Sequence, residues 1–282
     1  MAEQKSIGIF KLLGAIQPLS GQKIVFIREG ETVAEVFPEW IEESQLGDGY
    51  YLPFDLNIPV TLPKRANLKA AYKADPPLSE IGTIVSKRLA LELESRLRTS
   101  VKHIYTSPSL ASLQTAHAIQ KVFQERRSKE STIRVSHLLA TNGSAKKHWI
   151  AKNSLKNFGF IVDNSYETGE NKISQTELNQ EKVTQNIKQF LTEISETTET
   201  DTPVIIVCDS IAMALMVNEI RGETFNFPTE NAYEKCMKMF PASSSFVCDL
   251  CLEKRQLLTS KPDCNLRPLT SIGISCSVRY RP

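Results

Sequence analysis

The sequence predicts an α/β fold with a mostly parallel central sheet and helices on both faces. Residues 24–27 (IVFI) and 204–207 (VIIV) are uninterrupted apolar runs, as expected of parallel strands that are buried on both faces. Helical patterns alternate with such strands along the chain. This alternation is typical of a parallel sheet whose strands are joined by right-handed crossovers.

The elements are expected in the following order. Residues 1–21 form a short leader, and residues 22–282 form the domain, which begins with the first apolar strand. A proline-rich insert of about residues 32–77 follows that strand, and its length favours a binding loop or lid rather than a linker. A helix begins at about Leu78, because apolar residues recur at every fourth position from Ile81 to Leu97.

The second half repeats the pattern of strand, turn and helix. We expect strands at residues 101–105, 133–139 and 204–207, and helices at residues 109–126 and 176–194. The helix after the last of these strands ends near Arg221, where Gly222 provides a C-terminal cap. Residues 243–253 and 266–280 have strand character and are expected at a sheet edge.

Composition narrows the classes of function. The net charge of +2 is too small to indicate a nucleic-acid or membrane partner by itself. No apolar run reaches the length of a membrane span, so we expect a cytoplasmic protein, with the nucleus left open. All six cysteines lie in the last third; a zinc site around Cys248 and Cys251 is one interpretation, but residues three apart on a strand face opposite sides, which favours buried or edge thiols.

One stretch carries a specific resemblance. Residues 28–31 read Arg-Glu-Gly-Glu at the end of the first strand, where open α/β folds place their sites. The stretch resembles the Arg-His-Gly-Glu signature of the histidine phosphatase (phosphoglycerate mutase-like) superfamily. Residues 55–65 and 75–79 of the insert resemble the insert of one branch, the suppressor-of-T-cell-receptor-signalling (Sts) proteins and the ecdysteroid-phosphate phosphatases. The resemblance covers nearly the whole chain from Lys23, without the ubiquitin-associated and Src-homology-3 modules of the Sts proteins.

The resemblance implies a site with two arginines, a nucleophilic histidine, a second histidine and an acid. Arg28 matches the first arginine, whereas Glu29 stands at the nucleophile and Thr32 at a further arginine of this branch. Three more positions differ from the family: Ala111 at the second arginine, Thr141 at the acid and Asp209 at the second histidine. Phosphoryl transfer needs cations around the developing charge, so the resemblance predicts a vestigial pocket in an inactive phosphatase-like protein.

We expect this pocket to be net negative, with Glu29, Glu31 and Asp209 converging on Arg28. Arg28 would then form an ion pair between the carboxylates, or one carboxylate would be protonated by its neighbour. Two chemical alternatives remain: an acyl-phosphate on Glu29, or a divalent cation held by Glu29 and Asp209 in a metal-assisted hydrolase. We expect no cofactor and no bound metal.

The expected partners are proteins. The resemblance implies a homodimer, and apolar surface on the insert or tail strands could form its interface. A scaffold or adaptor role in an intracellular complex follows from the loss of catalytic groups. A second binding hypothesis is a basic loop at residues 146–156, with Lys146, Lys147, Trp149 and Lys152, that contacts RNA or an acidic partner; a solvated loop is the simpler interpretation.

Overall fold

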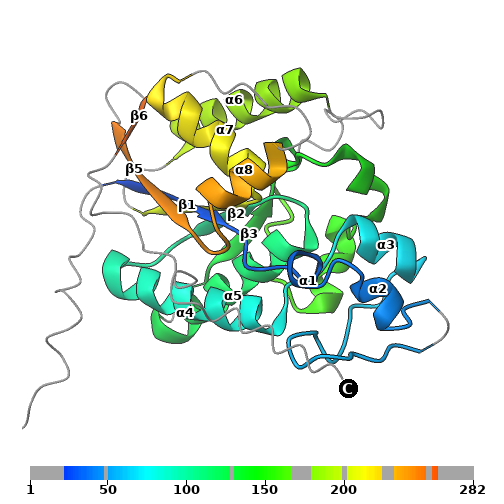
Figure 1. Cartoon of the computed structure of the whole chain (residues 1–282). Coiled ribbons are helices and arrows are strands. Elements are labelled where there is room, and N and C mark those ends of the chain that lie inside the picture. Colours follow the sequence, from blue (N-terminus) through cyan, green and yellow to red (C-terminus); the bar gives the residue numbers. More distant parts are fainter. Residues whose placement is uncertain are drawn as a thin grey trace, which may run out of the picture.

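A six-stranded mixed sheet organises the computed structural model of the chain, which describes residues 22–47, 50–127, 130–166, 179–198, 202–223, 232–251 and 256–259. The strand order is β3-β2-β4-β1-β5-β6 (Figure 1). The strands are β1 (Lys23–Arg28), β2 (His103–Thr106), β3 (Thr132–Val135), β4 (Val204–Cys208), β5 (Ser245–Cys251) and β6 (Gln256–Thr259).

The first four strands are parallel. β1 pairs with β4, β4 with β2, and β2 with β3, whereas β5 and β6 extend the sheet in antiparallel fashion beyond β1. The apolar runs of β1 and β4 lie side by side, with Ile24 opposite Val204 and Ile27 opposite Val207. The expected α/β fold with a mostly parallel sheet is therefore confirmed.

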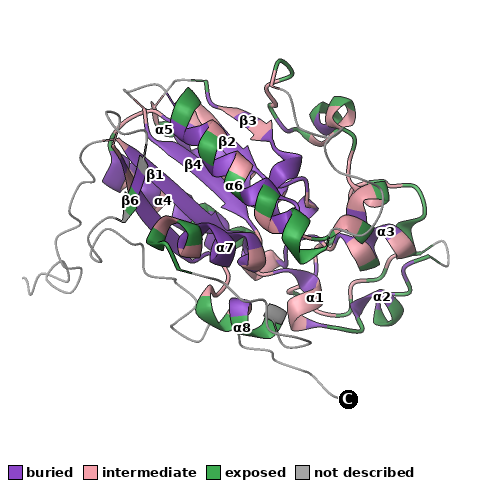
Figure 2. Cartoon of the chain, turned by 90° about the horizontal axis from the view of Figure 1, so that it is seen from above, coloured by how far each residue is buried: buried purple, intermediate pink, exposed green. Residues whose placement is uncertain are grey.

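Helices cover both faces of the sheet, and β1 divides its side chains between them. Ile24 and Phe26 pack in the cluster formed with α6 (Gln180–Thr197) and α7 (Ser210–Arg221). Val25 and Ile27 pack in the opposite cluster with α4 (Glu80–Leu97) and α5 (Leu110–Arg127). All six residues of β1 are buried (Figure 2). An uninterrupted apolar strand needs two cores, and these helices supply them.

The insert after β1 forms a small core of its own. It contains three short helices, α1 (Val33–Val36), α2 (Trp40–Glu43) and α3 (Leu68–Ala74). Trp40 and Tyr72 are nearly inaccessible and meet edge to face, with ring centroids 6.1 Å apart. This cluster also contains Leu110 at the start of α5. The insert is thus packed against the carboxyl ends of the strands rather than extended into solvent.

Several elements differ from their predicted bounds. β3 ends at Val135, and the predicted continuation to residue 139 is a 3-10 turn, His137–Leu139. The helix predicted at residues 176–194 is described only from Gln180, and it extends to Thr197. Neither α8 (Ala232–Met239), which packs on α7, nor β6 was predicted.

The tail prediction is tested only in part. Within residues 243–253, β5 is a strand, but it pairs with β1 on one side and β6 on the other, so it does not lie at the sheet edge. The predicted leader (1–21), the strand-like residues 266–280, Cys264 and Cys276 lie outside the described residues. Among the residues that are described, no helix combines the length and apolar character needed to cross a bilayer.

Candidate functional site: a cavity lined by carboxylates

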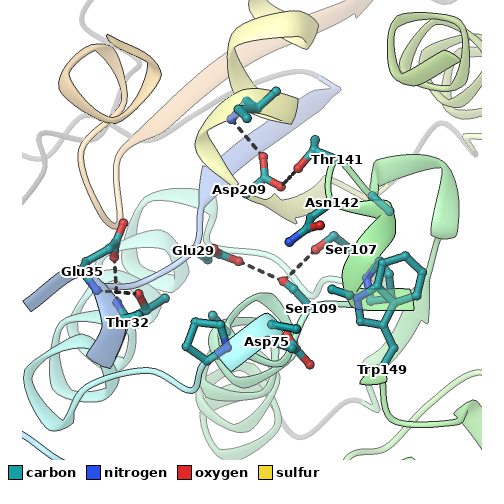
Figure 3. A pocket seen from close by; sticks show the side chains of 18 of the residues that line it. Glu29, Thr32, Glu35, Asp75, Ser107, Ser109, Thr141, Asn142, Trp149 and Asp209 are labelled. Atoms are coloured by element: carbon teal, nitrogen blue, oxygen red, sulfur yellow. Dashed lines mark hydrogen bonds between the residues drawn. The ribbon is translucent and has the colours of Figure 1, made fainter. Parts of the chain in front are cut away.

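A cavity of about 540 Å³ opens at the carboxyl ends of the parallel strands. It lies between β1, β2 and β4, near the centre of the sheet, where open α/β sheets usually place their ligand sites. Its lining has two parts, a strand-end wall outside the insert and an insert wall within it. The strand-end wall follows β1, β2 and β4 and comprises Glu29, Ser107, Ser109 and Asp209; the insert wall comprises Thr32, Glu35, Asp75 and Pro76 (Figure 3).

Glu29 is held in the strand-end wall by hydroxyl groups at the start of α5. Its Oε2 accepts hydrogen bonds from Ser109 Oγ (3.1 Å) and from Ser112 Oγ. Ser107 Oγ lies 3.0 Å from Ser109 Oγ and extends the hydroxyl chain. The Glu29 backbone N–H donates to Cys208 O (2.9 Å), which fixes the residue next to the end of β4.

Asp209 follows β4 and is the N-cap of α7. Its Oδ1 accepts from the backbone N–H groups of Ile211 (2.9 Å) and Ala212 (2.8 Å), and its Oδ2 accepts from Thr141 Oγ1. A helix N-terminus normally attracts an external anion through these free N–H groups. Here the chain's own carboxylate occupies the position.

The insert wall contains a carboxylate that is paired with Arg28. Glu35 forms a buried ion pair with the Arg28 guanidinium, and the side chain of Arg28 is only 2% exposed. Glu35 also accepts from Thr32 N–H (2.8 Å), while Thr32 Oγ1 accepts from Glu35 N–H, which makes the capping box of α1. Glu35 therefore connects the insert to the end of β1.

A second buried ion pair lies behind the cavity. Arg65 Nη2 lies 2.6 Å from Asp75 Oδ2, and the side chains are 5% and 2% exposed. Asp75 Oδ1 accepts from Leu110 N–H (2.8 Å) at the start of α5. Arg65 also stacks on Tyr72 at 5.0 Å from the ring centroid and donates to the carbonyl oxygen of His148. The pair ties the insert to the strand-end region.

Burial shifts the pKa of acids in both walls. In the insert wall it raises the pKa of Asp75, and the Arg65 charge opposes the shift. Burial raises the pKa of Glu29 to about 7; the Arg28 charge and the Ser112 hydroxyl oppose this shift, and the Asp209 and Glu35 carboxylates add to it. Burial also raises the pKa of Asp209 above its usual range, although the Thr141 hydroxyl and the α7 N–H groups oppose the shift. Near neutral pH Glu29 is thus close to half protonated.

The structure brings most of the predicted site residues together. Glu29, Thr32, Ala111, Thr141 and Asp209 all line the cavity, and Arg28 lies behind Glu35. One detail of the prediction was wrong. Glu31 does not converge on Arg28, because its carboxylate accepts from Ser79 Oγ (2.7 Å) and Asn57 Nδ2 (3.3 Å) next to α4. Arg28 forms an ion pair with Glu35, which was not predicted, and its charge also acts on Glu29 and Asp209.

Sequence reasoning missed Glu35, Asp75 and the role of Trp149. Glu35 had a local signal, because Thr32 and Glu35 are spaced as a capping box, but that pattern does not predict its contact with Arg28. Trp149 lines the cavity, and its ring centroid lies 5.3 Å from that of His137. No sequence signal placed this tryptophan in the pocket rather than in a basic loop.

The fold gives the residues of the predicted basic loop, 146–156, different surroundings. Trp149 lines the cavity, whereas Lys152 Nζ donates to the carbonyl oxygens of Asn164 (3.1 Å) and Tyr166 (2.5 Å). Lys146 is half-buried and Lys147 is exposed. The combination of an aromatic ring with adjacent free lysines, on which the RNA hypothesis depended, is therefore weakened.

The arrangement also bears on metal binding. Both oxygens of Asp209 are already hydrogen-bonded, which leaves Glu29 without a second free carboxylate for a divalent cation. Among the described residues, no group of three or more His, Cys, Asp or Glu side chains is placed to hold a metal ion. The four cysteines described, Cys208, Cys236, Cys248 and Cys251, are free thiols.

Curated relatives match part of the chain. Ubiquitin-associated and SH3 domain-containing protein A of Mus musculus is 36% identical over 129 residues, which are 44% of this chain and 20% of that protein. The ecdysteroid-phosphate phosphatase of Drosophila melanogaster is 29% identical over 148 residues, which are 52% of this chain and 20% of that protein. The matched region thus spans about a fifth of the length of these relatives.

A solved structure matches over a longer range. The ecdysone phosphate phosphatase of Bombyx mori, in complex with tungstate, superposes with a TM-score of 0.66 at 19% identity, covering 87% of this chain and 94% of that one. At this identity the likeness concerns the fold. The sequence model of the histidine phosphatase superfamily (branch 1) matches residues 64–237, which is more than half of the chain. The chain belongs to the histidine phosphatase superfamily.

Proposed function

We propose that this protein is a catalytically inactive member of its superfamily, a pseudophosphatase that acts as a protein-binding scaffold or adaptor subunit in an intracellular complex. One observation carries the proposal. The groups at the strand ends that are suited to hold a phosphate are already taken by the chain's own carboxylates, Glu35 on Arg28, Asp209 on α7 and Glu29 on the α5 hydroxyls.

The chemistry of phosphoryl transfer supports this proposal. The reaction requires cations and N–H donors directed at the charge that develops on the phosphoryl oxygens. Among the described residues that line the cavity there is no Lys, Arg or His, and there are four acids. A phosphate monoester entering the cavity would meet carboxylates in a poorly screened setting.

The family pattern supports it independently. By resemblance Glu29, Ala111, Thr141 and Asp209 stand where active members carry the nucleophile, an arginine, the acid and the second histidine. Removing one such group can leave residual rate, but losing the phosphate-binding groups as well removes ground-state and transition-state binding together. We infer that no phosphatase activity survives these four changes.

The decisive experiment is a phosphatase assay on the purified protein. With an aryl phosphate, and with or without divalent ions, we expect no turnover above buffer. Turnover that disappears in Glu29→Ala would overturn the proposal and favour a hydrolase that uses Glu29. Glu31→Gln is the matched control, because this acid contacts Ser79 and Asn57 outside the cavity.

Oxyanion binding gives a second readout that does not depend on turnover. The Bombyx mori relative was solved with tungstate, so it serves as the positive control in a thermal-shift titration. We expect tungstate to raise the melting temperature of that relative and to leave the melting temperature of this protein unchanged. Stabilisation of this protein by tungstate would show that the cavity still accepts a phosphate-like anion.

The protein-binding part of the proposal is supported by the outer surface of the insert. Tyr50, Leu52, Phe54 and Leu56 alternate along residues 50–56 and are 73%, 56%, 44% and 98% exposed. These four exposed apolar side chains lie within seven consecutive residues, and we call them the apolar ridge. Ridges of this kind are typical of interaction sites.

We expect the ridge to contribute to a homodimer. Four side chains of this size and exposure offer on the order of 500 Å² of apolar area, a large part of the ~800 Å² that each partner buries in a standard interface. Light scattering on wild type and Leu56→Asp tests this, with Ile84→Asp on α4, 65% exposed, as the matched control. A monomeric wild type would contradict the dimer, and affinity purification with mass spectrometry would then identify other partners.

A further inference from the structure

The four carboxylates of the cavity differ in how completely the chain uses them. Three have at least one protein partner on each oxygen. These are Glu35 (Arg28 and Thr32 N–H), Asp75 (Arg65 and Leu110 N–H) and Asp209 (Ile211 and Ala212 N–H, and Thr141).

Glu29 is the exception. Both of its hydroxyl donors, Ser109 and Ser112, bond to the same oxygen, Oε2. No described residue donates a hydrogen bond to Oε1, although the residue is only 7% exposed and lines the cavity. A carboxylate oxygen accepts hydrogen bonds, so Oε1 is available to a donor that a ligand supplies from the cavity.

The surroundings of this oxygen select the charge of the donor. Among the described residues that line the cavity no basic side chain competes for the carboxylate, and the nearby Arg28 is already paired with Glu35. An entering cation therefore meets Glu29 without a competing protein cation, whereas the described lining offers an anion no basic side chain. A group that only donates hydrogen bonds, an ammonium or a guanidinium, matches this free oxygen.

Trp149 supplies a surface for the same ligand. Its indole lines the cavity across from Glu29 (Figure 3), and the neighbouring ring of His137 limits its movement. Indole is the best aromatic partner for an organic cation, and the attraction is stronger where the cation is desolvated. The cavity volume of about 540 Å³ leaves room for the alkyl chain that carries such a group.

An inorganic cation fits these side chains less well. Mg²⁺ and Ca²⁺ require several oxygen ligands arranged around the ion. Oε1 of Glu29 is one oxygen, and the oxygens of the other three acids are each engaged by protein donors. A monovalent organic cation needs only one carboxylate and an apolar or aromatic surface.

We propose that the cavity is a receptor for one organic cation, an alkylammonium or guanidinium group, that binds to Glu29 Oε1 and packs against Trp149. The inference deepens the proposed function, on which it rests, by naming the chemistry of a partner. The group is supplied either by a free amine, such as a polyamine, or by a lysine or arginine side chain of a partner protein.

Calorimetric titration of the whole protein tests the site. The probes are n-butylammonium, methylguanidinium and spermidine, and a short peptide with one arginine beside the same peptide with citrulline. We expect saturable binding in the range of ~1 mM or tighter that falls at least about tenfold in Glu29→Gln, which keeps size and removes charge. Glu31→Gln is the matched control and should bind as wild type does, because its side chain lies outside the cavity.

The pH dependence provides a second readout. Glu29 must be ionised to hold the cation, and its pKa lies at about 7. The charged groups facing it are Arg28 beside it on β1, Asp209 after β4 and Glu35 from the insert. Affinity should therefore rise with pH through about 7 and level off above it, and Glu29→Gln should show no such rise.

Each outcome decides the proposal. Binding of the free amines that depends on Glu29 supports it with a small-molecule source, and binding only of the arginine peptide supports it with a partner side chain. No binding of any cation, binding unchanged in Glu29→Gln, or Glu29-dependent binding of Mn²⁺ or Ca²⁺ alone would overturn it. Failure here, with no phosphatase activity, leaves the proposed function intact; phosphatase activity would sink that function instead.

Discussion

The two walls of the cavity neutralise their carboxylates in different ways. In the insert wall, Glu35 and Asp75 each face a buried arginine, Arg28 and Arg65. In the strand-end wall, Glu29 and Asp209 have hydroxyl and N–H donors, and burial raises the pKa of both. Burial raises the pKa of Asp75 as well, but there the Arg65 charge opposes the shift. The carboxylates of the insert wall are therefore paired with arginines, whereas those of the strand-end wall are hydrogen-bonded to neutral donors.

This difference separates stability from binding. A buried ion pair that loses one partner leaves an uncompensated charge, so the insert wall is costly to change. A carboxyl group held by neutral donors can lose its charge by taking up a proton, at a cost set by its pKa. We therefore expect mutations in the insert wall to act on folding and mutations in the strand-end wall to act on pH dependence and ligand binding.

The largest effect is expected for Arg65→Met. The substitution removes the guanidinium that stacks on Tyr72 and leaves Asp75 buried without its cation, so it should lower the free energy of unfolding by about 3–5 kcal/mol. Urea denaturation measures it. Lys69→Met is the matched control, because Lys69 pairs with Glu42 on the surface, and it should cost less than about 1 kcal/mol.

A double variant sharpens the interpretation of this pair. Arg65→Met combined with Asp75→Leu removes both charges, and it should be less destabilising than the sum of the single changes. A sum that is strictly additive would show that the two side chains do not act as a pair, which would remove the contrast between the walls.

The next largest effect is a dependence of the unfolding free energy on pH, caused by Glu29. The pKa of Glu29 is raised from 4.5 to about 7 on folding, so the folded state binds the proton more tightly than the unfolded state. The resulting stability is fully present below pH 4.5 and is lost as pH rises through about 7. Its size is at most about 3 kcal/mol.

Glu29→Gln isolates this contribution. The difference in unfolding free energy between the variant and wild type should change between pH 4.5 and 7, in favour of the variant as pH rises. Burial lowers the pKa of His117, which adds a slope of opposite sign, but it does so in both proteins and cancels in the difference. A difference that is flat across this range would refute the raised pKa of Glu29.

The sequence predicted the framework because local patterns determine it. The runs at residues 24–27 and 204–207 are apolar at every position, and only a strand covered on both faces buries them all. The end of β3 was mispredicted because Leu138 and Leu139 were interpreted as a continuation of the apolar strand, and the 3-10 turn there follows from tertiary contacts. α8 is short and was not recognised by pattern.

The sequence predicted which residues lie at the site, but it did not predict which of them pair with one another. Position along the chain shows that Glu29 and Asp209 end neighbouring strands, so their meeting could be inferred. Charge alone, however, does not choose between Glu29, Glu31 and Glu35 as the partner of Arg28. That choice depends on the insert, where the capping box of α1 turns Glu35 toward Arg28, and where Ser79 and Asn57 hold Glu31 away.

The smallest effect is expected for substitutions of Asp209, which show whether this residue caps α7 independently of its charge. Asn accepts the same N–H groups as Asp, so Asp209→Asn keeps the cap of α7 and removes the charge, whereas Asp209→Ala removes both. The difference between the two variants should be about 1 kcal/mol, and Asn179→Ala at the exposed N-cap of α6 should cost a similar amount.

The same pair of variants tests the contrast between the walls. Because burial raises the pKa of Asp209, Asp209→Asn should be at least as stable as wild type at high pH, which none of the insert-wall substitutions should be. Urea denaturation at two pH values measures both statements. If Asp209→Asn were destabilised as strongly as Arg65→Met, the charge of Asp209 would be needed for folding, as the charges of the insert wall are. The proposed contrast between the two walls would then be wrong.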